Sequence, residues 1–177
     1  MKTFSFILGL LVSFCSQAGI EAFEAGPLIE SYGKHAKVEQ DVIVPENVTL
    51  KVAFDVSDTN GKNELNRKFD SLARFLNMHV ANGNKAENIQ LALVVHGKAG
   101  ADLLNEKAFK HKYETSNPNR ELLQLLMKHQ VKIYLCGQSA AYYDIKNSDL
   151  IDGVQMALSA MTTHALLQQK GYHLNPF

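Results

Sequence analysis

Two hydrophobic periods alternate along the chain from residue 48 onward. Short runs that alternate or are continuously apolar predict strands, and stretches with apolar residues three or four apart predict helices. The predicted strands lie at 48–56, 89–95, 131–135 and 153–159. The predicted helices lie at 63–80, 101–111, 120–129, 139–146 and 162–170. Residues 154–167 also fit one continuous helix, and both interpretations of that segment stay open at this point.

The order of these elements determines the expected fold class. Strands that alternate with helices favour right-handed crossover connections between parallel strands. The nearly continuous apolar run at 89–95 is typical of a strand that is buried on both faces of a sheet. We therefore expect an α/β fold with a mainly parallel sheet and helices on both of its faces.

The first 18 residues have the pattern of a signal peptide. Lys2 precedes an apolar stretch at 4–14, and Ser16-Gln17-Ala18 supplies small residues before a cleavage point. An alternative is a lipoprotein start at Cys15, which the bulky Phe14 disfavours. We expect an exported chain, periplasmic or secreted, with no membrane-spanning segment after cleavage, because no later apolar run reaches the required ~20 residues.

Length and composition indicate that the rest of the chain forms one ordinary globular domain. Residues 19–47 show no sustained period and are expected to form an irregular extension, and residues 48–177 form the α/β domain. The 18 basic and 18 acidic side chains balance, so nothing in the overall charge favours nucleic acid as a partner.

Cleavage after residue 18 would leave Cys136 as the only cysteine of the chain. Export usually places a protein where thiols are oxidised, and a single thiol there is either reactive or involved in pairing between chains. The alternative is a buried cysteine that serves as a small hydrophobic residue.

The position of Cys136 favours a reactive thiol. The carboxyl ends of parallel strands lie at one edge of the sheet, where ligands bind. Cys136 follows one such strand, Gly137 permits a tight turn after it, and Ser139 is a plausible N-cap of the next helix. A thiol at a helix N-terminus faces unpaired N–H groups that favour the thiolate.

Two further strand ends provide candidate site residues. His96 and Gly97 end the most hydrophobic strand, where an imidazole could support a thiolate and the glycine would admit a ligand. Asp55 ends the first strand and could hold a substrate. The alternatives are a histidine bonded within its loop and an aspartate that caps a turn. No histidine pair has metal-clamp spacing and no phosphate-binding loop occurs, so no metal site or cofactor is expected.

Four stretches together resemble a known family. They are "KVAFDVSD", "LVVHGKAG", "VKIYLCGQS" and "DGVQMALSAMTTHALLQQKGYHLNPF", and the similarity extends over residues 26–177. The chain resembles the DsrE/DsrF-like family of small sulfur-relay proteins, and within it the exported DsrE-like branch.

This resemblance implies several properties. It implies a three-layer α/β sandwich that assembles into homotrimers or homohexamers. It also implies that Cys136 accepts sulfur as a persulfide and exchanges it with a donor or acceptor protein. Some relatives carry a second cysteine where this chain has Ser139, so no resolving step within the chain is expected.

The sequence thus leads to one main hypothesis and an alternative. The main hypothesis is a sulfur carrier in which Cys136 is the nucleophile, His96 and the helix N-terminus support it, and no cofactor is needed. Asp55, Gly97, Gly137 and Ser139 would surround the bound group. The alternative is a module of the same fold that binds a small ligand or metal ion without covalent chemistry, or that acts through oligomeric contacts.

Overall fold

The structure is a computed structural model that describes residues 19–176. The predicted signal peptide, with Cys15, lies outside the described residues. Within the described part of the chain, no helix is both long and apolar enough to cross a bilayer.

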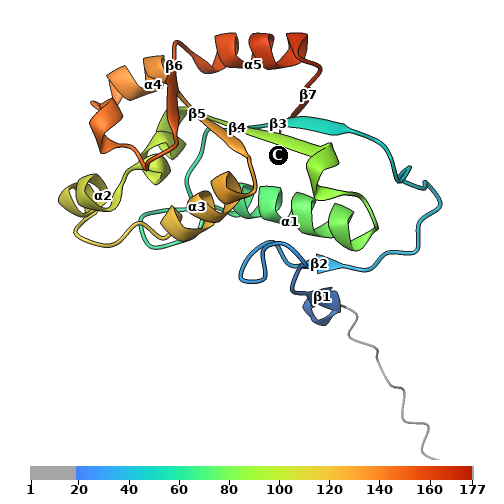
Figure 1. Cartoon of the computed structure of the whole chain (residues 1–177). Coiled ribbons are helices and arrows are strands. Elements are labelled where there is room, and N and C mark those ends of the chain that lie inside the picture. The colour runs from blue at the N-terminus through green and yellow to red at the C-terminus, as the bar shows by residue number, and fades with distance from the viewer. Residues whose placement is uncertain (1–18, 177) are drawn as a thin grey trace, which may run out of the picture.

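The centre of the molecule is a sheet of five parallel strands in the order β6-β5-β4-β3-β7 (Figure 1). The strands are β3 (Leu50–Val56), β4 (Ile89–Val95), β5 (Lys132–Cys136), β6 (Gln155–Ala157) and β7 (His173–Asn175). The predicted α/β class with a parallel sheet is therefore confirmed. The sequence did not predict β7, a three-residue edge strand whose only polar–apolar pattern is one leucine between two polar residues.

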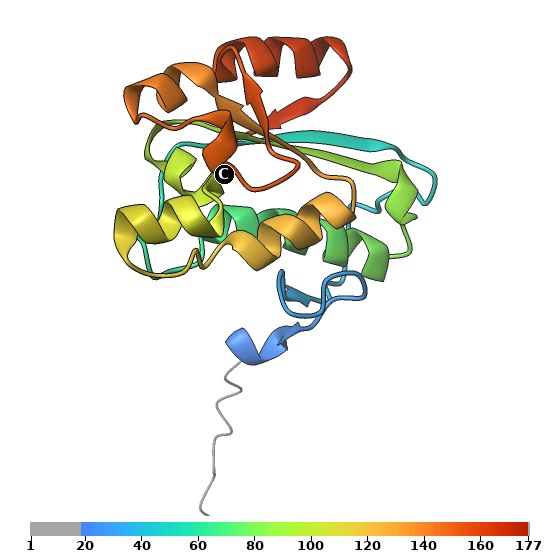
Figure 2. The same cartoon turned by 60° about the vertical axis from the view of Figure 1, so that its left-hand side comes forward.

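Helices cover both faces of the sheet and make three layers (Figures 1 and 2). The α-helices are α1 (Arg67–Ala81), α2 (Glu106–Tyr113), α3 (Arg120–Lys128), α4 (Gly137–Tyr142) and α5 (Ala160–Gln169). The short 3₁₀ helices are η1 (Ile20–Ala22), η2 (Ala86–Asn88), η3 (Gly97–Leu103) and η4 (Asn147–Asp149). Helices α1 and α3 lie side by side below the sheet in Figure 1, and α5 lies above it.

Side chains of each strand alternate between two cores of different size. Phe54, Leu93 and Leu135 belong to the larger core, which contains the buried faces of α1 and α3. Ala53 and Val94 belong to the smaller core beneath α5. Small strand residues on that second face let α5 lie close to the sheet.

Two predicted elements differ in the structure. The helix expected at 101–111 is instead η3 followed by α2, because the Asn105 side chain accepts the N–H of Ala108 and starts a new helix at Glu106. The segment around 154–167 is not one helix, so that interpretation is wrong. Strand β6 ends there, and Ser159 starts α5 by accepting the N–H of Thr162 at 3.0 Å.

The N-terminal extension is more ordered than its sequence indicates. Strands β1 (Phe23–Glu24) and β2 (His35–Ala36) pair in antiparallel fashion, and the intervening chain lies against α1 (Figure 2). Ile29 reaches the larger core and is only 2% exposed. The extension is thus part of the packed structure.

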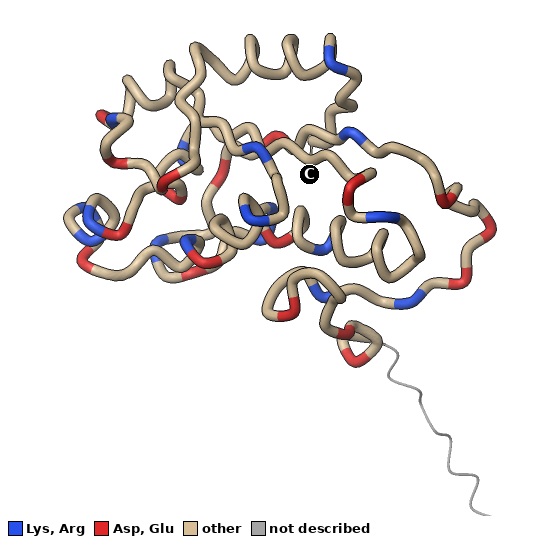
Figure 3. The backbone as a smooth tube through the Cα atoms, viewed as in Figure 1, with Lys and Arg blue, Asp and Glu red and all other residues tan. Residues whose placement is uncertain are grey.

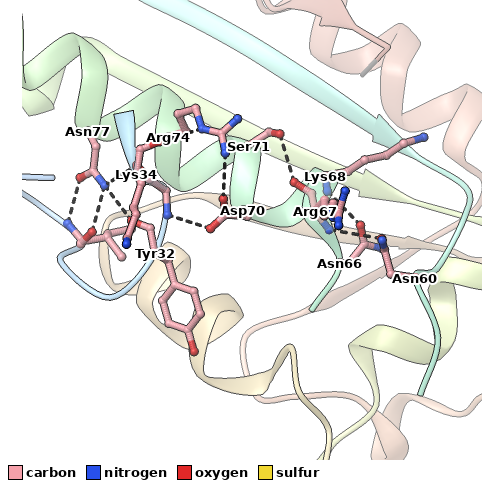
Figure 4. A network of polar contacts seen from close by, with 12 residues as sticks. Tyr32, Lys34, Asn60, Asn66, Arg67, Lys68, Asp70, Ser71, Arg74 and Asn77 are labelled. Atoms are coloured by element: carbon pink, nitrogen blue, oxygen red, sulfur yellow. Dashed lines mark hydrogen bonds and ion pairs between the residues drawn. The ribbon is translucent and has the colours of Figure 1, made fainter. Parts of the chain in front are cut away.

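One asparagine of α1 holds much of this extension in place (Figure 4). The fully buried Asn77 accepts the N–H groups of Leu28 and Ile29, at 3.2 and 3.0 Å. Its amide donates to the carbonyls of Ile29, Tyr32 and Gly33 at 2.9, 2.9 and 3.1 Å. Five backbone groups that have no strand partners are therefore satisfied by one side chain.

Candidate functional site

Cys136 is the last residue of β5 and the N-cap residue of α4. Its side chain points to the α5 face of the sheet, among Ala92, Val94 and Ala160. The residue is only 7% exposed, and it is the only cysteine among the described residues. The thiol therefore lies under α5, at the carboxyl edge of the sheet.

Hydrogen-bond donors from two helices converge on the thiol. The backbone N–H groups of Ser139 and Ala160, the Ser139 hydroxyl and the backbone N–H of Gln138 donate to it. Burial raises the pKa of the Cys136 thiol, but these hydrogen bonds outweigh burial and bring the pKa below its ordinary value. The site thus favours a thiolate, and part of that effect comes from the first residue of α5.

Ser139 and Gly137 serve the site in ways that differ from the prediction. Ser139 does not cap α4, because the helix begins two residues earlier. Its hydroxyl accepts the N–H of Gly97 at 2.9 Å and donates to Cys136. Gly137 is required by close approach and not by a left-handed turn, since a Cβ there would lie 2.5 Å from the carbonyl oxygen of Ala157.

Asp55 connects two histidines at the same edge of the sheet. Its Oδ2 lies 3.1 Å from Nε2 of His96, and its Oδ1 lies 2.6 Å from Nε2 of His164. Burial raises the pKa of Asp55, but the hydrogen bonds and charges of the two imidazoles outweigh burial and lower it. The carboxylate therefore stays ionised and fixes both rings.

The strand register brings this group next to the thiol. Val95 of β4 pairs with Leu135 of β5, so the next residues, His96 and Cys136, are neighbours on the same face of adjacent strands. The turn after His96 depends on Gly97, whose φ is +56° and whose Cβ would lie 2.9 Å from the Ser57 carbonyl oxygen. A side chain there would be strained and would crowd the end of β3.

All six residues that the sequence singled out thus lie at one edge of the sheet. The sequence reasoning missed His164, which is 14% exposed by its side chain and comes from α5. One signal was available. Ala160, Thr163 and Leu167 form the buried stripe of that helix, and His164 lies within the same stripe. A histidine on the sheet-facing side of a helix needs a polar partner, and that partner is Asp55.

The described residues contain no cluster of three or more His, Cys, Asp or Glu side chains arranged to hold a metal ion. The site offers a polarised thiol, a fixed imidazole pair and backbone donors. This arrangement is suited to nucleophilic chemistry at sulfur.

The fold and this geometry agree with a comparison against known families. A model of the DsrE/DsrF-like family matches residues 51–176. The chain belongs to the DsrE/DsrF-like family. Membership supports a sulfur-relay-type function at the level of the family, and the extension before residue 51 lies outside the match.

Solved structures share the DsrE/DsrF-like fold with this chain at low sequence identity. One is a protein of unknown function, MTH1491 from Methanobacterium thermoautotrophicum, with 12% identity and a TM-score of 0.55 over 72% of this chain and 99% of that chain. Another is the ychN protein from E. coli, with 18% identity and a TM-score of 0.52 over 72% of this chain and 100% of that chain. No curated protein matches the sequence.

Proposed function

We propose that the protein is a sulfur carrier in which the Cys136 thiolate accepts one sulfur atom as a persulfide. The observation that carries this proposal is the convergence of donors from α4 and α5 on a single thiol. The same donors that favour a thiolate would also favour a persulfide anion, because both are negatively charged sulfur groups.

The loading reaction balances without an added oxidant or cofactor. The Cys136 thiolate attacks the terminal sulfur of a polysulfide anion, and a new S–S bond forms to the cysteine. The S–S bond next to the attacked sulfur breaks, and its electron pair leaves with a polysulfide shortened by one sulfur. The cysteine ends as Cys–S–S⁻, and the total charge is unchanged.

His96 has a supporting role in this proposal. Asp55 accepts from Nε2 of His96 and fixes its ring at the end of β4, the strand next to β5, where a protonated ring would present its Nδ1–H to the departing sulfur species. His164 holds the other oxygen of Asp55 and so acts as a positioning residue. No second cysteine is found among the described residues, so release of the sulfur needs an acceptor thiol from outside the described chain.

Mass spectrometry of the intact protein tests the proposal. Because Cys15 is the second cysteine of the chain, all proteins carry Cys15→Ser. The protein is incubated with polysulfide and desalted. We expect a mass gain of one sulfur atom, reversed by dithiothreitol and absent after Cys136→Ser. A thiol that stays unmodified in the folded protein would overturn the proposal.

His96→Gln tests the supporting role separately. We expect loading of Cys136 to slow by about tenfold, the effect of losing one hydrogen bond to a charged group. His111→Gln, at an exposed position of α2, is the matched control and should load at the original rate. If the parent, His96→Gln and His111→Gln load sulfur at the same rate, His96 does not support the reaction.

We also propose that copies of the chain assemble with one another through α5. The large exposed apolar side chains on α5 and just before it are Leu158, Met161 and Leu166, which are 72%, 79% and 51% exposed. Residues 158–169 contain no Lys, Arg, Asp or Glu, and Figure 3 shows the uncharged stretch of α5 up to Lys170. Large exposed apolar side chains gathered on one element favour a contact between proteins. A homotrimer or homohexamer would bury it.

Export of the chain is the last part of the proposal. It rests on the signal-peptide pattern of residues 1–18. The mass of the protein recovered from its source compartment tests it: a chain that begins at residue 19 would support export, and a chain that retains residues 1–18 would contradict it.

A further inference from the structure

A cavity of about 270 Å³ lies where the extension crosses the C-terminal half of α1. The extension contributes His35, Val38 and Val44 to its wall, and α1 contributes Met78 and His79. The volume is close to the lower limit of ordinary ligand sites, so it suits an ion or a very small molecule.

The Nε2 nitrogen of His79 is available to bind a metal ion. Its Nδ1 lies 2.7 Å from the backbone carbonyl oxygen of Phe75 and donates its hydrogen there. With its hydrogen on Nδ1, a neutral ring carries its free lone pair on Nε2. A histidine whose second nitrogen is fixed by a carbonyl is the usual arrangement of an imidazole metal ligand.

His35 is buried without a partner. The residue is 4% exposed, and within the described part of the chain neither ring nitrogen has a hydrogen-bond partner. A buried polar group normally has a partner, so an unpaired imidazole indicates that something else binds it. His35 is one of the residues that line the cavity, and a half-turn of its ring about the Cβ–Cγ bond exchanges the positions of nitrogens and carbons.

Met78 adds a soft sulfur donor to the same wall. It precedes His79 on α1 and is 38% exposed. Among the described residues that line the cavity there is no Asp or Glu, whose carboxylates are common ligands of hard cations such as Mg²⁺ and Ca²⁺. Two imidazoles and a thioether are soft or borderline ligands, and a thioether in particular favours Cu(I).

We propose that His35, Met78 and His79 bind one Cu(I) ion in the cavity between the extension and α1. Two of the ligands come from α1 and one from β2, so the ion would connect the extension to the domain. The extension lies outside the family match at 51–176, so this site is an addition to the shared fold. The proposal is independent of sulfur transfer at Cys136.

Competition with a chromophoric Cu(I) chelator tests the proposal in the full chain. Both cysteines are replaced by serine, because a thiolate would itself bind copper. Oxygen is excluded and ascorbate keeps the metal reduced. We expect one Cu(I) per chain. Met78→Leu and His79→Gln should each weaken binding by about tenfold or more. His35 itself is left in place, because replacing a buried side chain risks unfolding the extension.

Two matched variants serve as controls. Met161→Leu removes an exposed thioether from α5, and His111→Gln removes an exposed imidazole from α2. Both should bind copper as the parent does. X-ray absorption of the bound ion should show a sulfur neighbour that disappears in Met78→Leu. Absence of stoichiometric binding, or binding that Met78→Leu and His79→Gln leave unchanged, would overturn the proposal. So would tighter binding of Zn²⁺ than of Cu(I) at the same residues.

Discussion

At the scale of single residues, Ser139 links two loops to the thiol. Its hydroxyl accepts the N–H of Gly97 and donates to Cys136, so three consecutive groups form one hydrogen-bonded chain. A hydroxyl can fill both roles at once, because it has one donor hydrogen and two acceptor lone pairs. A serine at position 139 therefore suits the thiolate form of Cys136.

Ser139→Ala should raise the pKa of the Cys136 thiol, because one of its donors is lost. Alkylation by iodoacetamide near pH 7 should slow by about tenfold, the equivalent of one hydrogen bond to a charged group. The measurement is the alkylation rate as a function of pH. Ser139→Thr keeps the hydroxyl and should keep the original profile. If the alanine and threonine variants behave alike, the hydroxyl does not support the thiolate.

Asp102 is a second residue whose ionisation the structure controls. It is 2% exposed, and it accepts hydrogen bonds from the Thr59 hydroxyl at 2.9 Å and the Asn66 amide at 2.8 Å. Burial raises the pKa of its carboxyl from 3.8 to about 6, although both hydrogen bonds act in the opposite direction. None of the ion pairs between described residues involves this carboxylate, so its ionisation disfavours the folded state.

The pH dependence follows from that pKa. Below pH 3.8 the carboxyl is protonated in both states, and between 3.8 and about 6 the folded state binds more protons than the unfolded state. The free energy of unfolding should therefore fall as pH rises through this window, by about 3 kcal/mol in total. Asp102→Asn cannot ionise, and urea unfolding between pH 4 and 7 should show this decrease only in the parent. Parallel pH profiles for the two proteins would contradict the prediction.

At the scale of elements, α1 and the extension depend on one another. Gly33 has φ +66°, and a Cβ on it would lie 2.3 Å from the α1 backbone at Ala73, so only glycine allows this approach. Asp70 accepts the Gly33 N–H at 2.7 Å, and Arg74 donates to the Lys34 carbonyl at 2.8 Å (Figure 4). The extension is thus attached to α1 by both packing and polar contacts.

Asn77→Ala should release the extension while the rest of the domain stays folded. Five backbone groups lose their partner, and each unsatisfied buried group costs about 1–3 kcal/mol unless water replaces it. We expect faster proteolysis and faster hydrogen exchange between residues 23 and 36. Asn82→Ala, at an exposed end of the same contact, should have little effect. If proteolysis and hydrogen exchange of the extension are the same in both variants, Asn77 is not its main attachment.

The first residues of α4 and α5 show how accurately local sequence patterns predict where a helix begins. The sequence predicted α4 from residue 139, and the helix begins at Gly137 because β5 runs on through Cys136 and leaves no loop. Helix α5 begins at Ala160 because Ser159 caps it. Both starts differ by about two residues from the prediction, which is the usual error of boundary assignment. At this site, a shift of two residues in a helix start changes which N–H groups face the thiol.

At the scale of the whole molecule, α5 covers one face of the sheet and is exposed on its outer side. The helix is buried towards the sheet by Ala160, Thr163 and Leu167 and carries apolar residues on its outer side as well. Large apolar side chains that a helix exposes to solvent often mark a contact with another protein. The second side therefore favours contact with another copy.

Met161→Asp should reduce self-association, because a charge at the centre of an apolar contact loses its hydration. We expect the parent to sediment as an oligomer and the variant to sediment as a smaller species. Sedimentation velocity at several concentrations measures this change. Val42→Asp, at a residue that is 84% exposed in the extension, should leave the assembly intact. A parent that sediments as a monomer at all concentrations would contradict assembly through α5.

The sequence by itself determined the class of fold and the edge at which a site could lie. Strand patterns at 48–56, 89–95 and 131–135 depend on local alternation or on a continuous apolar run, and parallel strands necessarily present their carboxyl ends together. The positions of Asp55, His96 and Cys136 at strand ends follow from that rule. These features need no knowledge of which strands are neighbours.

Only the tertiary structure decided which groups touch. His164 lies 109 residues from Asp55, and the Ala160 N–H reaches Cys136 only because β6 pairs with β5 and directs α5 back across the sheet. The cavity beside His79 likewise depends on an extension whose strands have two residues each. Such contacts depend on strand order and packing, which arise from the free energy of the whole molecule and leave no period in the local sequence.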